Sequence, residues 1–402
     1  MDKKGDTIWI PVGPQHPFLK EAAKFDFEIR GEEIVSARYQ MGYNHRGIEK
    51  ACEERNYYQV LYLLERTCGI CSHSHTSAFV GAVEQILGIE LPPRAKYLRS
   101  LIGELERLHS HLLWLGVAAH EVGFDTLFML SWRDREVVMQ ILEEVSGNRV
   151  HYAINTIGGV RRDLTPEQVQ RIREMIEPLQ KRLEHYAHIG TTEPSFVGRI
   201  KGVGLLSKEK ALAMCAVGPF ARASGLAMDI RKDDPYAAYP EVQFDVVWNS
   251  ECDIYGRVLV RVFEMVESLK IIKQLLDQLP DGEIAVPKVP RRVPAGYAVS
   301  RYEAPRGEDC HYVRGNGTDK PERVKVRAPT MANAVSATES VIGCLVADIP
   351  IAIASMDPCF SCTDRTTIVL NDPRKGRQIL SMEEMRRYGI DWYRKYKGVS
   401  PR

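Results

Sequence analysis

Apolar positions divide the chain into β-like ends and a long helical middle. Residues 7–11 and 25–39 are β-like, and within the second stretch residues 25–29 alternate apolar and polar side chains before a turn at Gly31, which predicts a small β region. Residues 94–120 carry leucine or isoleucine at three- and four-residue spacing, which predicts a long amphipathic helix. The pattern is helical from about residue 45, with further helices expected at 134–157, 165–188, 207–229 and 254–279. The middle of the chain is therefore expected to be a helical bundle.

The last third of the chain is less regular. Residues 280–300 contain four prolines and are expected to form a loop, and residues 301–326 read as irregular or β-like. A helix is expected near 330–345, followed by a strand-like apolar run at 349–354. The predicted fold class is mainly α, with a central bundle of long helices and small β elements in the N-terminal and C-terminal regions. One domain at 1–365 is expected to hold a β region at about 1–44, the bundle at about 45–280 and a C-terminal metal-loop region at about 300–365, followed by an extension at 366–402.

Composition narrows the setting in which the chain works. Its 402 residues are 44% hydrophobic, which suits one large domain or two fused ones. The formal net charge of +1 gives no general attraction for nucleic acid, so no nucleic-acid partner is expected. There is no run of 18 apolar residues and no visible secretory signal, and nine cysteines, an odd number, suit a reducing cytoplasm.

Two Cys-x-x-Cys pairs, Cys68 with Cys71 and Cys359 with Cys362, lie near opposite ends of the chain. Zinc ribbons place such pairs about 15–20 residues apart, because the metal holds a small fold together. A chain of this length can bury a core without a metal. A thiol redox motif needs only one pair, and no thioredoxin-like pattern surrounds either. Spacing alone leaves structural zinc, a nickel, iron or cluster site, and disulfides as alternatives.

Polar residues near the cysteines are candidates for neighbours of a metal. Four buried thiolates repel one another, so a site of this kind needs metal ions and nearby donors. Arg66, His73 and His75 flank the first pair, while Arg306 and Thr330 precede the second pair. Each of them taken singly is explained as well by a solvated or capping side chain. Together they are typical of groups that surround a metal centre.

The two cysteine motifs resemble those of a known family. Arg66-x-Cys68-Gly-x-Cys71-x-x-x-His75 and Asp357-Pro-Cys359-x-x-Cys362-x-x-Arg365 are similar to the two signature motifs of the large subunit of nickel–iron hydrogenases. Further segments resemble the energy-converting, membrane-bound branch and the related 49-kilodalton subunit of respiratory complex I. They are Gly13–Pro17, Asn44–Lys50, Glu104–Trp114, Gly218–Gly225 and Asp234–Tyr239. The resemblance, which runs from about residue 10 to residue 365, implies the fold of that family.

The resemblance also implies a ligand set. Cys68 and Cys359 would be terminal ligands of nickel, and Cys71 and Cys362 would bridge nickel to an iron that carries carbon monoxide and two cyanides. Arg306 would lie against one cyanide, and Thr330, next to Pro329, would donate to the other. His75 would donate to a bridging thiolate, with Arg66 close to the first pair. The second motif ends in Arg365 rather than His, which leaves open the ligands of any additional magnesium or iron site.

The implied reaction is reversible reduction of protons to dihydrogen, coupled to ion translocation. The remaining cysteines show no cluster spacing, so electrons would come through an iron–sulfur small subunit, with ferredoxin as donor. Membrane antiporter-like subunits would complete a complex in which this chain is peripheral, on the cytoplasmic side of the cell membrane. Glu21 would relay protons to Cys359, with His16 and His45 as the next candidates. The alternative is a complex I-like, quinone- or sulfur-linked coupling subunit without hydrogenase activity. Complex I relatives, however, lack the four cysteines, and sulfur-reducing relatives have altered motifs.

Residues 366–402 form a basic tail with nine Lys or Arg and four Asp or Glu. Ser381 and Glu384 are spaced as a capping box for a short helix. The tail is either a surface segment that touches a partner or anionic lipid, or a maturation peptide. Many members of the family carry such a peptide, which a dedicated protease removes.

Overall fold

The computed structural model describes residues 7–364, 371–372, 376–377 and 382–398. It separates into two units, residues 1–365 and residues 366–402. Within the described part of the first unit the strands are β1 (Ile8–Val12), β2 (Lys24–Arg30), β3 (Glu33–Gln40), β4 (Asn155–Thr156), β5 (Gly159–Val160), β6 (Gly296–Ala304), β7 (Gly307–Gly315) and β8 (Arg323–Arg327). The second unit holds β9 (Asn371–Asp372), β10 (Gly376–Arg377) and α14 (Met382–Lys397).

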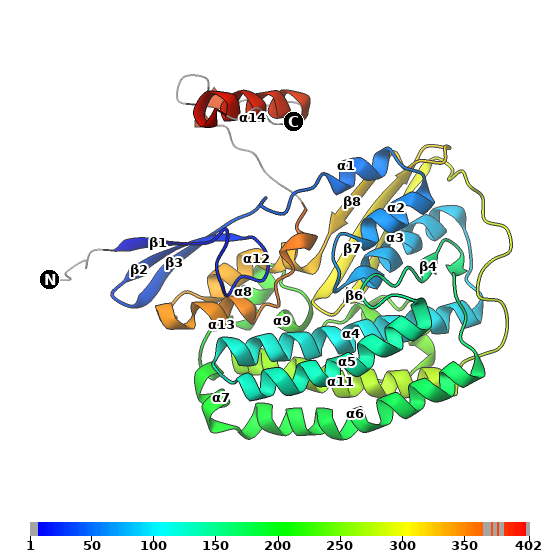
Figure 1. Cartoon of the computed structure of the whole chain (residues 1–402), viewed down its shortest axis with the longest axis horizontal. Helices are drawn as coiled ribbons and strands as arrows, with labels where there is room; N and C mark the ends of the chain where they lie inside the picture. The colour runs from blue at the N-terminus through cyan, green and yellow to red at the C-terminus, as the bar shows by residue number, and fades with distance from the viewer. Residues whose placement is uncertain (1–6, 365–370, 373–375, 378–381, 399–402) are drawn as a thin grey trace. The chain divides into compact units, whose positions relative to one another are not determined.

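Helices make up most of the first unit, as the predicted fold class requires. They are α1 (Ile48–Glu53), α2 (Tyr57–Glu65), α3 (Ser72–Leu87), α4 (Pro93–Glu121), α5 (Asp125–Ser146), α6 (Pro166–Thr192), α7 (Pro194–Ile200), α8 (Lys208–Ala213), α9 (Gly218–Arg222), α10 (Ile230–Asp233), α11 (Ile254–Asp277), α12 (Pro329–Ser340) and α13 (Ile349–Ala354). The long helices α4, α5, α6 and α11 pack side by side into a bundle (Figure 1). Their leucines and isoleucines form the main core.

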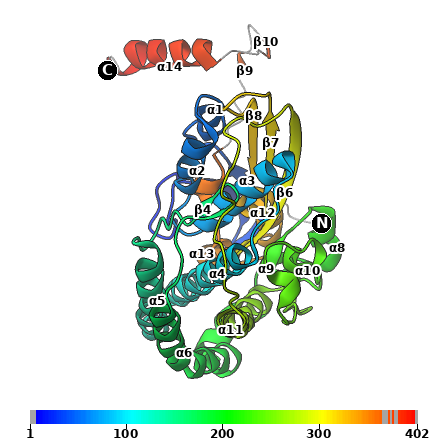
Figure 2. The same cartoon turned by 90° about the vertical axis from the view of Figure 1, so that its right-hand side faces the viewer.

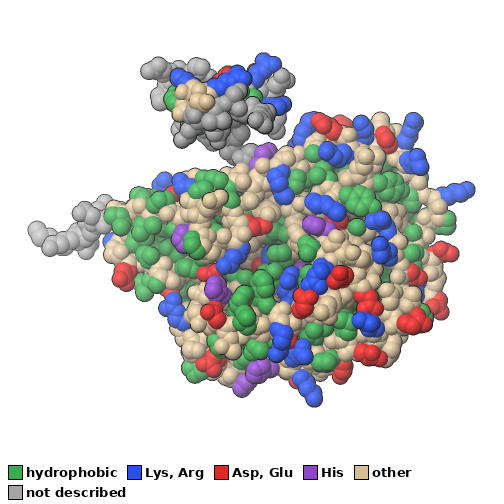
Figure 3. All heavy atoms as spheres, viewed as in Figure 1, with side chains coloured by type: hydrophobic (Ala, Val, Ile, Leu, Met, Phe, Trp, Pro, Cys, Tyr) green, Lys and Arg blue, Asp and Glu red, His purple; other side chains and the backbone are tan. Residues whose placement is uncertain are grey.

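Two antiparallel sheets flank this bundle. β1, β2 and β3 form an N-terminal meander, in which Phe25, Phe27 and Ile29 on β2 point into the core. β6, β7 and β8 form a second meander, and α3 packs against β6 and β7. Figure 2 shows this second sheet and the long helices on different sides of the unit. Charged side chains of both signs are interspersed over the described residues of the face drawn in Figure 3.

The strongly periodic segments form the elements that their patterns predict. The strands at 7–11 and 25–39 are confirmed, as are the helices at 94–120, 165–188 and 254–279. Thr165 caps α6 with a capping box to Gln168, and the Asp253 side chain accepts a hydrogen bond from Gly256 at the start of α11. The stretch 301–326, read as irregular or β-like, belongs to the β6–β8 sheet. The helix near 330–345 is α12.

Three segments differ from prediction. The helix expected at 134–157 is α5, which ends at Ser146 because Gly147 adopts a left-handed conformation. The helix expected at 207–229 is broken into the short helices α8 and α9. There Gly218, at φ 67°, approaches the backbone of Gly307 too closely for any side chain.

The third difference is the apolar run 349–354, which is the helix α13 and not a strand. It is buried against α4, so every face needs apolar residues and the usual helical periodicity disappears. Pro350 sits in its first turn, where the missing N–H costs no hydrogen bond. Ser381 of the expected capping box lies outside the described residues, whereas the helix that would follow it is α14.

Candidate metal centre

The fold brings the four motif cysteines together in one buried cluster. Their Sγ atoms all lie within 4.8 Å of one another, and all four side chains are buried. Cys359 Sγ lies 3.0 Å from Cys68 Sγ and 2.8 Å from Cys362 Sγ, while Cys71 Sγ lies 3.3 Å from Cys362 Sγ. The four are free thiols rather than disulfides. This enclosed set of soft donors fits a thiolate-bound transition metal.

Local capping interactions set the position of each cysteine loop. Cys71 immediately precedes α3, and Glu106 of α4 accepts hydrogen bonds from the first N–H groups of that helix, His73 N at 2.7 Å and Ser74 N at 3.1 Å. The second loop follows α13, where Asp357 has a φ of 61°, an uncommon conformation for a residue other than glycine. The cysteines thus stand at the start of one helix and just after another.

Four thiols at this distance cannot all ionise without added positive charge. Hydrogen bonds from Cys359 and Cys362 hold the pKa of Cys68 well below its usual value. Burial raises the pKa of Cys362 well above its usual value. The protein alone therefore favours one thiolate among several thiols, and a metal would be needed to deprotonate the remainder.

Arg306 brings a buried cation to the second cysteine loop. Its Nε donates to the carbonyl of Asp357 at 2.9 Å, one terminal nitrogen donates to the Asp357 carboxylate at 2.6 Å, and the other donates to Ser110 Oγ at 2.9 Å. The guanidinium thus holds the unusual backbone two residues before Cys359. Arg306 also lines a cavity together with Cys359.

Thr330 and Pro329 lie at the start of α12, both buried. The Thr330 hydroxyl oxygen accepts a hydrogen bond from the backbone N–H of Cys359 at 2.9 Å. Pro329 takes the first helical position, and the neighbouring Ala328 packs against the four cysteines. This end of α12 therefore fixes the backbone of Cys359 and leaves the hydroxyl proton of Thr330 available for a further acceptor.

His75 connects the cluster to two residues that sequence reasoning did not identify. Its Nε2 lies 3.3 Å from Cys362 Sγ, and its Nδ1 lies 2.9 Å from the Asp309 carboxylate. His311 Nε2 is 3.3 Å from the same carboxylate oxygen. Burial opposes a charge on His75, but Asp309 outweighs it and raises the pKa. The Asp-x-His alternation on β7 places both side chains on one face of the strand, which is the only sequence signal that could have revealed them.

Glu21 lies against the second cysteine loop. Its carboxylate accepts hydrogen bonds from the N–H of Ser361, at 2.8 Å, and from the Ser361 hydroxyl. Burial raises the pKa of Glu21, and the negative charge of Cys68 raises it further. Glu21 and Cys359 line one cavity of about 230 Å³, whose other walls include Ile70, Leu113 and Trp114. Glu21 also lines a neighbouring, more open hollow with His16.

The structure does not bring every predicted residue to the cysteines. The Arg66 guanidinium donates to the Glu65 carboxylate at 2.5 Å, and the side chain is 49% exposed. His73 Nε2 bonds the carbonyl of Arg99 at 3.0 Å, and burial lowers its pKa to about 3. His45 Nδ1 bonds the carbonyl of Asp364. Arg365, at the end of the second motif, lies outside the described residues.

Comparison with known proteins adds independent information. Residues 46–120 match the family described as nickel-dependent hydrogenase. Residues 121–291 and 288–365 match the family described as the 49 Kd subunit of respiratory-chain NADH dehydrogenase. The chain belongs to this combined family of membrane-bound hydrogenase and complex I 49-kilodalton subunits. The resemblance inferred from the motifs and the predicted fold class are therefore confirmed.

Several relatives match almost the whole chain. It is 43% identical to the membrane-bound hydrogenase subunit alpha of Pyrococcus furiosus over 96% of this chain and 92% of that protein. It is 41% identical to the carbon monoxide-induced hydrogenase of Rhodospirillum rubrum, over 89% and 99%. A solved structure of the membrane-bound sulfane sulfur reductase, an archaeal respiratory membrane complex, superposes with a TM-score of 0.85 at 33% identity, over 91% of this chain and all of that one. Membership thus assigns the chain to an oxidoreductase family whose members are subunits of membrane complexes. No helix in the described part of the chain is both long and apolar enough to cross a bilayer.

Proposed function

We propose that the chain is the catalytic large subunit of an energy-converting nickel–iron hydrogenase, which reversibly reduces protons to dihydrogen. The observation that carries the proposal is the cluster of Cys68, Cys71, Cys359 and Cys362, four buried Sγ atoms within 4.8 Å of one another. A structural zinc site would also use four thiolates. Zinc, however, gives no reason for the acid, the cation and the cavity that meet at Cys359. Identity of 43% to a membrane-bound hydrogenase subunit supports the same reading.

In this proposal Cys68, Cys71, Cys359 and Cys362 would together hold a nickel–iron centre. Carbon monoxide and cyanide on the iron belong to the proposal, whereas an additional magnesium or iron site is left without an assigned ligand. The bound centre would supply the redox chemistry of dihydrogen. The chain would supply the thiolates and the groups around them.

The surrounding residues would position the centre and move protons. Arg306 would offset the negative charge of the centre while it fixes the backbone before Cys359. Thr330 would hold the Cys359 N–H, with Pro329 starting its helix, and His75 would donate to Cys362. Glu21 would exchange protons with Cys359 across their shared cavity, because burial raises the pKa of its carboxyl group. The Arg66 side chain, which pairs with Glu65 and is half-exposed, would have no direct contact with the sulfur atoms.

The proposal extends to partners. An iron–sulfur small subunit would deliver electrons, with ferredoxin as the donor to the complex, and membrane antiporter-like subunits would couple turnover to ion translocation on the cytoplasmic side. Residues 1–365 would form the catalytic domain. Residues 366–402 would correspond to the C-terminal segment that a maturation protease removes from some members of the family.

A second candidate is a sulfur- or quinone-linked coupling subunit without hydrogenase activity. The TM-score of 0.85 to a sulfane sulfur reductase complex favours it, since the same fold serves that complex. The two candidates differ in what the cysteine cluster holds and in which substrate is reduced. Fold likeness therefore does not separate them.

Metal analysis combined with infrared spectroscopy of the purified complex tests the proposal. We expect nickel together with iron in excess of it, because the iron–sulfur partner adds its own iron, as well as infrared bands of carbon monoxide and cyanide and dihydrogen evolution from a reduced low-potential donor. Zinc in place of nickel, or reduction of polysulfide without any dihydrogen evolution, would reject the hydrogenase in favour of the second candidate. The four single Cys→Ser variants serve as controls, because each should lose the infrared bands.

A further inference from the structure

One arginine outside the cysteine motifs connects the two cysteine loops. A terminal nitrogen of Arg46 donates to the carbonyl of Thr67, immediately before Cys68, and to the carbonyl of Ser361, between Cys359 and Cys362, both at 2.8 Å. Its other terminal nitrogen donates to the carbonyl of Arg66 at 3.2 Å. A planar guanidinium with several fixed donors can bond carbonyls of two loops at once.

Asp364, two residues after Cys362, completes this connection from the opposite direction. Its carboxylate accepts hydrogen bonds from the backbone N–H groups of Arg46 at 2.5 Å and of Ile48 at 2.8 Å. Gly47 lies between these two donors with a φ of 68°, a left-handed conformation that turns neighbouring N–H groups toward one anion. Asp364 is only 9% exposed, whereas the Arg46 side chain is 42% exposed, so the carboxylate is the buried half of this connection.

Ser361 is held from both sides at the same point. Its carbonyl accepts from Arg46, while its N–H and hydroxyl donate to Glu21. The peptide groups between Cys359 and Cys362 are therefore fixed by side chains from two other segments. All of these contacts join protein atoms to protein atoms, so none of them needs a metal.

We propose that Arg46 and Asp364 form a loop clamp, which holds the two cysteine pairs at ligand distance from each other independently of the metal. Arg46 and Asp364 are positioning residues: they touch the backbone next to the cysteines and not the sulfur atoms. The inference rests on the proposed four-thiolate site but not on which metal occupies it. The clamp reduces the freedom that the thiolates would otherwise lose on binding a metal, which preorganises the site.

Protection of individual thiols in the full-length chain, produced without nickel, tests the loop clamp. The chain is treated with iodoacetamide, and the labelling rate of each cysteine is measured by peptide mass spectrometry. In Arg46→Met we expect Cys68, Cys71, Cys359 and Cys362 to label about tenfold faster than in the parent, because the loops open locally when the bridging hydrogen bonds are lost. Asp364→Asn should give a smaller increase at the same four cysteines, since the amide oxygen can still accept one N–H.

Two internal references and one matched variant make the result specific. Cys344 is buried away from the cluster and reports global unfolding, while the exposed Cys215 reports reagent activity. Arg55→Met removes another guanidinium that bonds a backbone carbonyl, that of Ala51, but only within its own helical region, so it should label like the parent. Arg46→Lys keeps the positive charge but loses the planar set of N–H donors, so the four cysteines should label at a rate between those of the parent and Arg46→Met.

The possible outcomes separate the clamp from the proposed function. Faster labelling of the four cysteines with Cys344 still protected supports the clamp, even if infrared spectra of the parent later exclude nickel and iron. Full protection of the four cysteines in Arg46→Met, or in Arg46→Lys if the Met variant does not fold, overturns the clamp. The clamp would also be overturned if Cys344 labelled as much faster as the four cysteines in each variant, because the loss of protection would then be global.

Discussion

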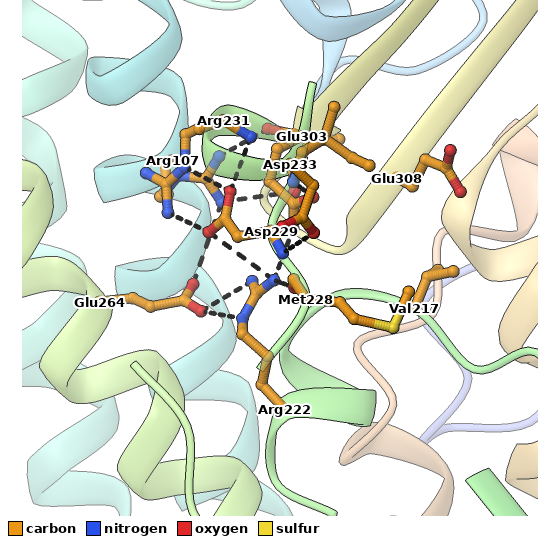
Figure 4. A network of polar contacts seen from close by, with 12 residues as sticks. Arg107, Val217, Arg222, Met228, Asp229, Arg231, Asp233, Glu264, Glu303 and Glu308 are labelled. Carbon is orange, nitrogen blue, oxygen red and sulfur yellow. Dashed lines mark hydrogen bonds and ion pairs between the residues drawn. The ribbon is translucent and has the colours of Figure 1, made fainter. Parts of the chain in front are cut away.

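Two clusters of ionisable side chains are buried in the first unit, and they differ in how their charges are balanced. Figure 4 shows the first, an ion network between α4, α9, α10, α11 and β6. Arg222 donates to Glu264 and to Glu303, both at 2.8 Å, and Arg231 donates to Glu104 at 2.9 Å and to Asp229 at 2.7 Å. Counted with Arg107, the network contains the guanidiniums of Arg107, Arg222 and Arg231 and the carboxyls of Glu104, Asp229, Glu264 and Glu303.

Within the ion network the protein supplies its own counterions. Burial opposes ionisation of Glu264, but Arg222 and His111 outweigh it and hold its pKa well below the usual range. Burial raises the pKa of Glu303 to about 7, which favours the neutral form of the one carboxyl in excess over the guanidiniums. The charges are complete without any ligand, as expected for a structural network.

The cysteine cluster is not completed in this way. Both basic side chains beside it already pair with a carboxylate, the Arg306 guanidinium with Asp357 and the His75 imidazole with Asp309. The four thiols therefore have no matching positive charge from the described residues around them, and a metal would provide it. The difference teaches that a buried cluster whose charges balance serves the fold, whereas one that does not balance indicates a ligand. The predictions below test this contrast, from the largest effect to the smallest.

Replacing any one of Cys68, Cys71, Cys359 or Cys362 by Ser should abolish dihydrogen activity, by a factor of about 10³ or more. A hard hydroxyl oxygen is a poor substitute for thiolate on nickel. The fold should remain, because the core does not depend on the metal, and circular dichroism should match the parent. Cys215→Ser, at an exposed thiol, is the control and should stay active. Substantial activity in two of the four variants would contradict a four-thiolate catalytic site.

Glu264→Gln should destabilise the protein by about 3–5 kcal/mol, because Arg222 loses a buried counterion. Denaturant unfolding of the parent and the variant measures the change. Glu174→Gln, on the exposed face of α6, should alter the free energy of unfolding by less than about 0.5 kcal/mol. If both variants were equally stable, the network would not be structural in the sense argued above.

Glu21→Gln should lower turnover about a hundredfold while nickel, iron and the infrared bands stay unchanged. The amide matches the shape of the carboxyl group and can still accept the N–H of Ser361, but it cannot carry a proton. Glu33→Gln, at the exposed first residue of β3, is the matched control. Normal turnover in a fully metallated Glu21→Gln would move the relay to His16 or His45. Loss of the infrared bands would show instead that Glu21 acts by holding Ser361.

Arg306→Lys should lower activity about tenfold and shift the cyanide bands, although the charge is conserved. An ammonium cannot reproduce the three fixed hydrogen bonds to Asp357 and Ser110. Arg301→Lys, on the preceding strand β6 and exposed, should behave like the parent. Parent-like activity with unshifted bands in Arg306→Lys would show that Arg306 has no role at the metal centre.

Glu303→Gln should change the pH dependence of stability. The folded protein raises the pKa of Glu303 from 4.5 to about 7, so its stabilising protonated form is fully present below pH 4.5 and is lost as the pH rises through about 7. The parent should therefore lose about 1–3 kcal/mol across this window relative to the variant, whose amide stays neutral. Denaturant unfolding at several pH values compares the slopes, and parallel slopes would contradict the assignment.

Sequence reasoning was accurate where the information is local. The periodicity of residues 94–120 is sufficient for α4, because one face of a long helix must stay apolar. The prediction of a strand at 349–354 was wrong, because burial on all sides removes the helical periodicity of apolar residues. The prediction of one helix at 207–229 was wrong, because the close approach of Gly218 to Gly307 depends on a distant strand.

Within the candidate site, the cysteines and His75 could be identified because their spacing follows a motif. Asp309, Arg46 and Asp364 could not, because their roles arise from contacts across the fold. Arg46 and Asp364, for example, are 318 residues apart in the sequence. Arg66 shows the opposite error, since a position two residues from Cys68 does not bring its side chain to the sulfur atoms.

The large separation of the two cysteine loops has a consequence for how the protein is made. Cys68 and Cys359 are 291 residues apart, so at about 5–20 residues per second the ribosome needs roughly 15–60 s to add the second pair after the first. Throughout that interval the nascent chain offers a two-thiolate half-site that any soft divalent metal can occupy. Asp364 emerges later still, so the loop clamp closes only at the end of synthesis. If the cysteines hold a metal as proposed, timing as well as affinity would therefore bear on which metal reaches the finished site.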